Sequence, residues 1–314
     1  MSRRRKFRPE AAMHIFQISV TRGIVFCTIP DLILLYTLIC TRAPKHRAHI
    51  ISMTIMLNHF HIEASFQKLD DLELYMNEVT SVFARKYNKH YGLSGQLFHR
   101  PFGSSVKGNE KLKFNNYIYI GNNAKDKQAV KRAEEYRWNF LKFSENSFPF
   151  SEPYHPDKAS KEMRSLVKKV KTYKINNRVI GYDFFECREY QYLKEAEKQQ
   201  LIDMIINEYN VIDYSPALAK YGSPTKIYEV MNTVSGSEYG SGDDFDKEDY
   251  RHYYKMINIA MEEGYDMRTQ RFVGIGDGKG QMSVELAARL QRRFSLEVQP
   301  GIKEIKKFFY FIIH

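Results

Sequence analysis

The stretch that most constrains this chain is residues 57–63, Leu-Asn-His-Phe-His-Ile-Glu, which follows an apolar run over residues 50–56. An apolar run rich in Ile, Met and Thr predicts a buried strand. Because alternate side chains of a strand share a face, His59, His61 and Glu63 should project to one side of it. Two imidazoles at this spacing can hold one divalent metal. The same pattern also fits two partly exposed histidines on a sheet, so the metal interpretation needs a partner residue elsewhere.

The basic charge is concentrated in the half of the chain that carries these histidines. The 314 residues have a formal net charge of +11. Residues 1–150 contain 23 Lys and Arg against 12 Asp and Glu, a difference of +11, whereas residues 151–314 contain 25 of each. Such a basic region indicates a polyanionic partner, most simply nucleic acid, with a merely basic soluble surface as the alternative. The length suits two domains of ordinary size.

Cysteine usage and the apolar segments bear on the compartment. The three cysteines, Cys27, Cys40 and Cys187, are widely spaced and form no Cys-x-x-Cys pair, which predicts a cytoplasmic protein in a reducing environment. The apolar segment 23–40 is interrupted by Pro30-Asp31, and the remaining run is too short to cross a bilayer. No membrane association is therefore expected. The basic N-terminus lacks the apolar region and cleavage site of a secretory signal.

Residues 11–143 predict one α+β domain, preceded by a flexible basic arm over residues 1–10. Apolar residues at helical spacing predict a long amphipathic helix over 69–91, closed by Gly92. The alternation of elements favours helices packed on a mostly antiparallel sheet. The expected elements are strands at 13–20 and 23–27, a helix at 32–40 with Pro30 in its first turn, strands at 48–57 and 58–65, the helix at 69–91, a strand or extended segment at 96–102, and helices at 109–123 and 130–143.

The second half differs in character. Residues 144–156, with three prolines, predict a linker. Residues 157–314 then predict a mainly α-helical accessory domain of unknown role, with helices at 157–173, 190–210, 224–232 and 247–263. Two glycine-rich stretches, 235–246 and 274–280, lack key positions of a calcium loop and a phosphate loop, respectively. Helical patterns over 284–294 and 302–309 are compatible with a helix-turn-helix, although an ordinary helical hairpin is favoured.

A partner for the histidines occurs within residues 116–124. On a helix, Tyr119 and Asn123 are neighbours at i and i+4. A tyrosine phenol can act as a nucleophile, and an amide oxygen one turn away can complete a metal site with two histidines. The alternative is a core aromatic residue with an asparagine at a frayed helix end, which spacing alone does not exclude.

Four short motifs follow one another within residues 11–143. They are residues 56–61 (Met-Leu-Asn-His-Phe-His), residues 83–98 (a helical stretch followed by a Ser-Gly-x-Leu-Phe turn), residues 119–124 (Tyr-Ile-Gly-Asn-Asn-Ala) and residues 135–139 (Glu-Tyr-Arg-Trp-Asn). Together they resemble the motifs of the REP-associated tyrosine transposases, single-strand DNA transposases of the HUH (His-hydrophobe-His) type, with Leu57 and Ala124 where the family has proline. The second half of the chain carries no motif of this kind.

The resemblance implies a ferredoxin-like or RRM-like sheet with the histidines on a central strand. It implies a divalent metal, Mg²⁺ or Mn²⁺, held by His59, His61 and Asn123. Tyr119 would be the catalytic nucleophile, with Tyr117 as its rival. Tyr119 is preferred because it keeps Asn123 at i+4, whereas Tyr117 would place Gly121, which has no side chain, at the ligand position.

The implied reaction is cleavage and rejoining of DNA through a 5′-phosphotyrosine. The expected partner is single-stranded or hairpin DNA, bound by a monomer or homodimer. Two other classes remain open: a nucleic-acid-binding protein of the same fold without catalysis, and a metal-dependent nuclease that uses water. The candidate DNA-binding residues are Arg4, Arg5, Arg85, Lys86, Lys89 and Arg100.

Overall fold

The protein was analysed as a computed structural model. Its described residues are 6–20, 24–26, 28–127, 129–233, 256, 259–260, 262–266, 271–272 and 284–298. None of the helices in these ranges is long and apolar enough to span a membrane.

The core of the first half is a four-stranded antiparallel sheet. Its strands are β1 (Ala12–Ile18), β2 (His49–Ile55), β3 (His59–Ser65) and β4 (Gly103–Lys107), in the spatial order β2-β3-β1-β4. Helix α1 (Ile29–Lys45) joins β1 to β2, and helix α2 (Leu69–Tyr91) joins β3 to β4. This βαββαβ order is the ferredoxin-like arrangement, so the predicted α+β fold class is confirmed.

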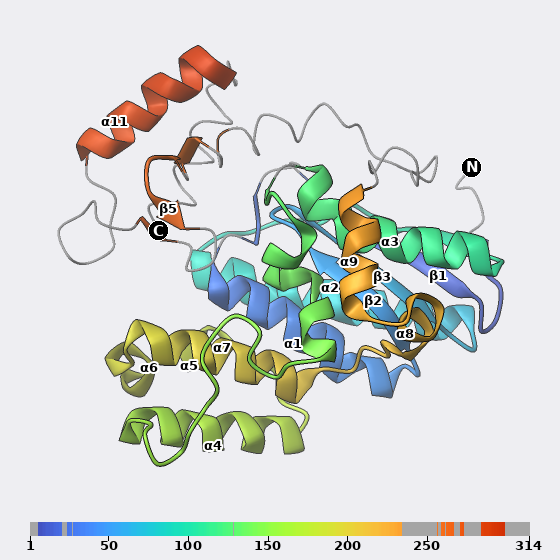
Figure 1. Cartoon of the computed structure of the whole chain (residues 1–314), viewed down its shortest axis with the longest axis horizontal. Helices are drawn as coiled ribbons and strands as arrows, with labels where there is room; N and C mark the ends of the chain where they lie inside the picture. Colours follow the sequence, from blue (N-terminus) through green and yellow to red (C-terminus); the bar gives the residue numbers. More distant parts are fainter. Residues whose placement is uncertain are drawn as a thin grey trace.

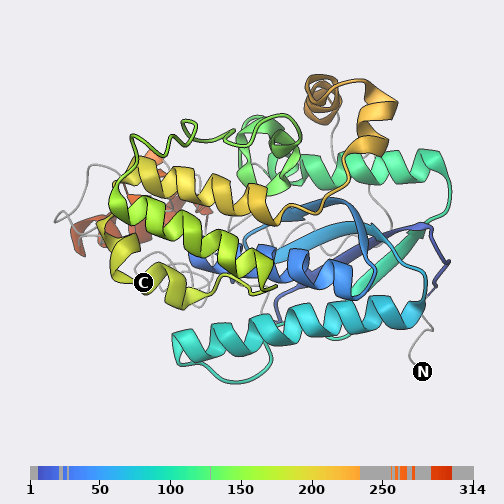
Figure 2. The same cartoon turned by 90° about the horizontal axis from the view of Figure 1, so that it is seen from below.

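Helices cover both faces of the sheet (Figures 1 and 2). Figure 2 shows the sheet between α3 (Glu110–Asp126) on one side and α1 and α2 on the other. On the α2 side the Phe60 ring packs near Phe26, at 6.2 Å between centroids, and Phe26 packs 5.2 Å from Phe83. The alternation of β3 therefore turns its hydrophobic residues towards α1 and α2, and its histidines towards α3.

Local signals set the ends of the two long helices. Thr28 caps α1 through a capping box with Asp31, and Pro30 occupies its first turn. Helix α2 ends at Gly92, which adopts the left-handed conformation with φ of 63°. Only glycine enters this region without steric cost, so the predicted boundary at 69–91 is confirmed.

Three sequence predictions in this half are wrong. Residues 130–143 form not one helix but three short 3₁₀ turns, η1 (Ala133–Glu135), η2 (Arg137–Asn139) and η3 (Leu141–Ser144). The Asn139 amide donates to the carbonyl of Ala133 at 2.7 Å, and this side-chain bond competes with helical bonding.

The other two concern strands. The last strand is β4 at 103–107, whereas 96–102 is a loop with a single bridge between Phe98 and Ser19. Residues 24–26 form no strand, because the amides of Val25 and Phe26 both donate to the carbonyl of Leu57.

The second half adds helices to two places on this core. Helices α4 (Lys161–Ile175), α5 (Tyr182–Glu186), α6 (Arg188–Tyr192) and α7 (Glu195–Tyr209) form a layer beside α1 (Figures 1 and 2). The Tyr36 hydroxyl of α1 donates to the carbonyl of Ile206 at 2.7 Å, and the Ile180 amide donates to Thr37 at 3.2 Å. Helices α8 (Ser215–Tyr221) and α9 (Pro224–Thr233) pack near α3.

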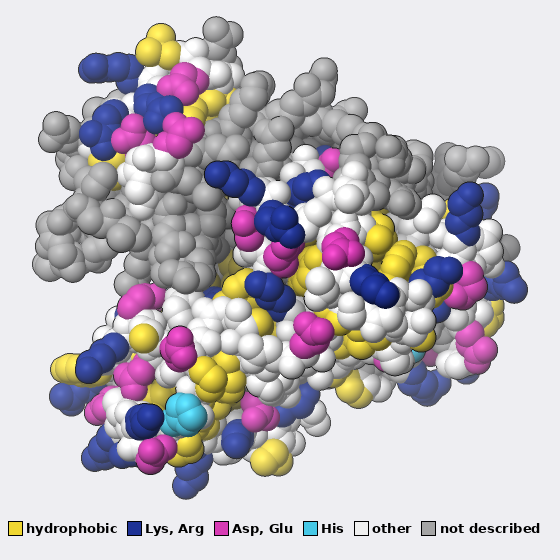
Figure 3. Space-filling view, viewed as in Figure 1, with side chains coloured by type: hydrophobic (Ala, Val, Ile, Leu, Met, Phe, Trp, Pro, Cys, Tyr) yellow, Lys and Arg dark blue, Asp and Glu magenta, His cyan; other side chains and the backbone are white. Residues whose placement is uncertain are grey.

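The predicted helices at 157–173, 190–210 and 224–232 are confirmed in outline by α4, α7 and α9. Near the C-terminus the structure describes short strands β5 (Tyr265–Asp266) and β6 (Arg271–Phe272), helix α11 (Val284–Arg293) and a short π-helix, η5 (Phe294–Val298). The glycine-rich stretches 235–246 and 274–280, most of the predicted helix at 247–263, and the second helix of the C-terminal hairpin lie outside the described residues. Figure 3 shows acidic and basic side chains interspersed over α4–α9, in keeping with the balanced charge of this half.

Candidate functional site

The two histidines of β3 lie side by side beneath α3. The rings of His59 and His61 are 4.9 Å apart between centroids, and each side chain is only 7% exposed. Strand β1 adds His14, whose ring lies 5.0 Å from that of His61. The predicted common face of the His-Phe-His stretch is therefore present, and a third imidazole joins it.

Helix α3 brings Tyr119 and Asn123 to the same place. The Tyr119 ring lies 5.7 Å from the ring of His61 and 5.7 Å from that of His14. The Nδ2 atom of Asn123 lies 3.4 Å from Nε2 of His61. Because Tyr119 and Asn123 are one helical turn apart, both face the histidines.

The rival tyrosine lies elsewhere. Tyr117 belongs to a separate apolar cluster that includes Ile227, Tyr228 and Met231 of α9. Burial, followed by neighbouring tyrosines, raises the pKa of Tyr117 well above its ordinary value. Its hydroxyl is therefore held in the neutral form on a different side of α3 from Tyr119.

Hydrogen bonds orient the imidazoles. His59 Nδ1 lies 2.8 Å from Oδ1 of Asn58, so this nitrogen carries the proton and donates. The Nε2 atom of His59 then keeps its lone pair. His61 Nδ1 lies 2.9 Å from Nε2 of His14. In the tautomer in which His61 Nδ1 donates to His14 Nε2, a lone pair remains on Nε2 of His61, which lies 3.4 Å from Nδ2 of Asn123.

Burial keeps all three imidazoles neutral. It lowers the pKa of His14 and of His59 to about 3, and that of His61 well below its ordinary value. Repulsion by Lys107 adds to the effect at His14, and repulsion by Lys127 adds to it at His59. Neutral imidazole is the form that binds metal.

The donor atoms fit a divalent ion. Asn123 Oδ1 is buried and has no hydrogen-bond partner among the described residues. Together with Nε2 of His59 and of His61 it gives two nitrogen donors and one oxygen donor, a set that suits Mn²⁺ better than Mg²⁺ because Mg²⁺ prefers oxygen ligands. Within the described ranges, no three His, Cys, Asp or Glu residues are arranged to hold a metal, so this set depends on the asparagine.

Two further buried groups adjoin the site. Burial raises the pKa of Glu63 to about 8, an effect partly offset by Asn116, Lys113 and Lys107. The second group is His14 on β1, which lies directly opposite Glu63 in the antiparallel register of β1 and β3. Sequence reasoning put Glu63 on the histidine face but gave it no role, and it missed His14, because a single sequence does not reveal which strand lies beside β3.

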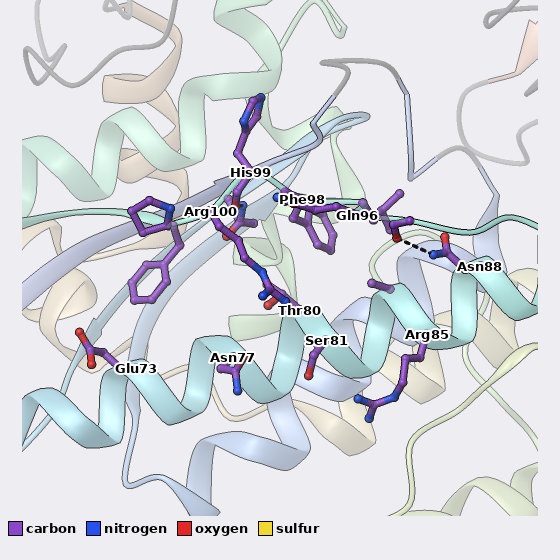
Figure 4. Close-up of a pocket in the computed structure, with 16 residues that line it drawn as sticks. Glu73, Asn77, Thr80, Ser81, Arg85, Asn88, Gln96, Phe98, His99 and Arg100 are labelled. Carbon is purple, nitrogen blue, oxygen red and sulfur yellow. Dashed lines mark hydrogen bonds between the residues drawn. The ribbon is translucent and has the colours of Figure 1, made fainter. Parts of the chain in front are cut away.

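The predicted DNA-binding residues fall in different places. Arg85 and Arg100 line one cavity of about 690 Å³ between α2 and the loop at 95–102 (Figure 4). Lys86 and Lys89 are exposed on α2, and neither lines this cavity. Arg4 and Arg5 lie outside the described residues.

Comparisons with known proteins found a similarity only among solved structures. No family model matches the chain, and no curated protein matches it. Among solved structures, the chain is similar to a REP-associated tyrosine transposase bound to a REP hairpin, with 16% sequence identity and a TM-score of 0.38. The alignment covers 44% of this chain and 81% of that one.

Proposed function

We propose that this protein is a metal-dependent single-strand DNA transposase or endonuclease that works through a 5′-phosphotyrosine on Tyr119. The observation that carries the proposal is the meeting of Tyr119, His59, His61 and Asn123 at one buried point between β3 and α3. The motif resemblance and the basic charge of the first half both point to the same reaction on DNA.

The chemistry is a balanced transesterification. The phenol oxygen of Tyr119 attacks the scissile phosphorus as its proton is lost, the bond from phosphorus to the 3′ oxygen breaks, and that oxygen leaves as a 3′ hydroxyl after gaining a proton. A second 3′ hydroxyl reverses the step and joins a new strand. A divalent ion held by His59, His61 and Asn123 would stabilise negative charge on a non-bridging phosphate oxygen. The energy of the broken bond is kept in the phosphotyrosine, so no nucleotide cofactor is needed.

The reaction requires a rearrangement around α3, because Tyr119 is 7% exposed and Asn123 is 2% exposed. Helix α9 contacts α3: the ammonium group of Lys125 on α3 donates a hydrogen bond to the carbonyl of Asn232 on α9 at 2.7 Å. The burial of the site also favours a second candidate, a nucleic-acid-binding protein of the same fold that does not cleave.

The deciding experiment is a search for a covalent adduct. Because Tyr119 would join the 5′ phosphate of the downstream fragment, a library of hairpin-bearing single strands is labelled at the 3′ end and incubated with the protein and Mn²⁺. We expect labelled protein on a denaturing gel, retention of the label by Tyr117→Phe, and its loss in Tyr119→Phe. Labelled protein from Tyr119→Phe would overturn the nucleophile assignment.

The same assay separates the alternatives. A shortened strand with a free 5′ phosphate and no adduct would indicate a nuclease that uses water. Binding without any cleavage would indicate the non-catalytic protein.

A further inference from the structure

The cavity between α2 and the loop at 95–102 lies on the opposite face of the sheet from the histidines. On β1, Phe16 points to the histidine face, where its ring lies 6.2 Å from that of His61, so the next residue, Gln17, points to the α2 face. Gln17 lines the cavity. The cavity is therefore separate from the site of Tyr119, and its lining residue Phe102 directly precedes β4, one of the two edge strands of the four-stranded sheet.

The loop that forms one wall is held in place by three side-chain amides. Gln17 donates to the carbonyl of His99 at 2.7 Å, Asn88 to that of Gly95 at 2.9 Å, and Gln96 to that of Phe98 at 2.6 Å. These bonds fix the backbone of the loop without using either arginine. The wall is preformed, which lowers the entropic cost of binding a ligand.

Among the described residues, the two arginines that line the cavity form no ion pair. No carboxylate lies within ion-pair distance of Arg85 or Arg100 in the part of the chain that the structure describes. Figure 4 shows Arg100 reaching from the loop towards α2 beside Thr80, while Arg85 belongs to α2 itself. One acidic residue, Glu73, stands on the lining. Both guanidinium groups are exposed, with Arg100 extending towards α2 and the Arg85 side chain extending from α2 on the side away from the loop (Figure 4). Each can bind a phosphate through paired donors.

The rest of the lining suits a base. Leu97, Phe98 and Phe102 supply apolar surface, and Asn77 and Ser81 supply an amide and a hydroxyl. A volume of about 690 Å³ is within the range of roughly 300–1,000 Å³ that small-ligand sites occupy. An anionic group joined to a flat, partly polar ring therefore matches the cavity better than an inorganic ion does.

We infer that this cavity binds one unpaired nucleotide of a DNA strand, with its phosphate on Arg85 and Arg100 and its base against Phe102. The inference rests on the proposed function for its choice of DNA, which the charge excess of the first half also favours. A polynucleotide is favoured over a free nucleotide because Lys86 and Lys89 continue the basic character of α2 beyond the cavity. The protein would then hold the strand on one sheet face and cleave it at the other, with the strand passing the β4 edge.

The test measures binding rather than cleavage. Affinity of the full chain for a fluorescent 20-nucleotide single strand is measured at several salt concentrations for wild type, Arg85→Ala, Arg100→Ala and the double variant. The matched control is Lys131→Ala, which removes an exposed charge away from the cavity. We expect each arginine variant to weaken binding by about tenfold and to reduce the salt slope by about one, whereas the control stays near wild type. Circular dichroism checks that each variant is folded.

Two outcomes would overturn the inference: arginine variants that bind like Lys131→Ala, or a mononucleotide, thymidine 5′-monophosphate, that competes as effectively as the oligonucleotide. Failure of the proposed function is distinguishable from both. In that case no adduct forms with any strand, yet the arginine variants still bind single strands more weakly than the control does.

Discussion

The Nε2 atom of His14 on β1 lies 2.9 Å from the Nδ1 atom of His61 on β3. Metal-binding histidines in proteins commonly use the second ring nitrogen in this way, because a bond there fixes the ring and its tautomer. In the proposed metal site, His14 would therefore act as a positioning residue for His61, although it is 45 residues before the first histidine of β3.

Replacing His14 should weaken metal binding without removing a ligand. We expect His14→Ala to raise the Mn²⁺ concentration needed for half-maximal adduct formation by about 10–100-fold, the usual effect of losing such a partner. Mn²⁺ binding is also followed directly by electron paramagnetic resonance. His49→Ala is the control, because His49 is exposed on β2 and pairs with Asp213 at 2.9 Å. An unchanged Mn²⁺ requirement in His14→Ala would show that His61 does not depend on it.

Removing a ligand itself should have a larger and more selective effect. His59→Ala and His61→Ala should each abolish adduct formation, because each loses one of three donors. Binding of single-stranded DNA should be largely retained, since affinity comes mainly from phosphate contacts. The measurement pairs an adduct assay with a binding assay on the same strand. Metal-dependent cleavage that survives in both variants would rule out the metal assignment.

The buried carboxyl of Glu63 should give stability a distinctive pH dependence. Burial raises its pKa from 4.5 to about 8, so the folded state keeps a proton that the unfolded chain releases. Its contribution to stability is complete below pH 4.5 and is lost as pH rises towards 8, at about 1.4 kcal/mol per pH unit. His14, His59 and His61 have the opposite sign, because their pKa values are lowered and they destabilise the fold only below about pH 6.5.

Comparison with Glu63→Gln separates the carboxyl from the histidines, because both proteins carry the same three imidazoles. In metal-free protein, the free energy of unfolding of the wild type should fall relative to that of Glu63→Gln as pH rises from 6.5 to 8. Chemical denaturation in urea at four pH values measures both. Parallel curves for the two proteins would mean that Glu63 is ionised in the folded state.

A buried ion pair links the segment after α3 to α7. Arg137 Nε lies 3.3 Å from Oδ1 of Asp203, with side-chain exposures of 4% and 0%. Asp203 also accepts hydrogen bonds from the Phe150 amide and the Ser151 hydroxyl. Burial nevertheless raises the pKa of Asp203 above its ordinary value, more than Arg137 lowers it.

Arg137→Met should destabilise the protein by about 3–5 kcal/mol, because it leaves the Asp203 carboxylate buried without its counter-charge. Arg132→Met is the matched control: Arg132 pairs with Glu134 at the surface, where such a pair is worth about 0–1 kcal/mol. Urea denaturation at pH 7 compares the two. Similar losses in both variants would show that the buried pair has no special energetic role.

Local sequence signals predicted some of these features. The boundary of α2 was predictable because Gly92 and the helical spacing before it act within one or two turns. The common face of His59 and His61 was predictable because strand alternation needs no knowledge of neighbouring strands. The meeting of Tyr119 and Asn123 followed from helix geometry in the same way.

Features set by distant contacts were not predictable. The 96–102 segment was predicted to be a strand or extended segment, but Gln17 and Asn88 hold it as a loop, so strand β4 begins only at Gly103. The helix expected at 130–143 is replaced because Asn139 bonds back to Ala133, and the Tyr136 hydroxyl bonds to the carbonyl of Ile55 at 2.7 Å. The apolar residues of 130–143 recur at helical spacing, yet their burial against β2 favours three short 3₁₀ turns over one helix.

The position of α1 has a consequence for synthesis of the protein. This helix is buried on nearly all sides, and part of its cover is α7, whose last residue, Tyr209, follows the end of α1 by more than 160 residues. At about 5–20 residues per second, the ribosome finishes α7 on the order of ten seconds after α1 has left it. During that interval an apolar helix surface is exposed on the nascent chain. A chaperone that binds such surfaces would protect it until the second half of the chain arrives.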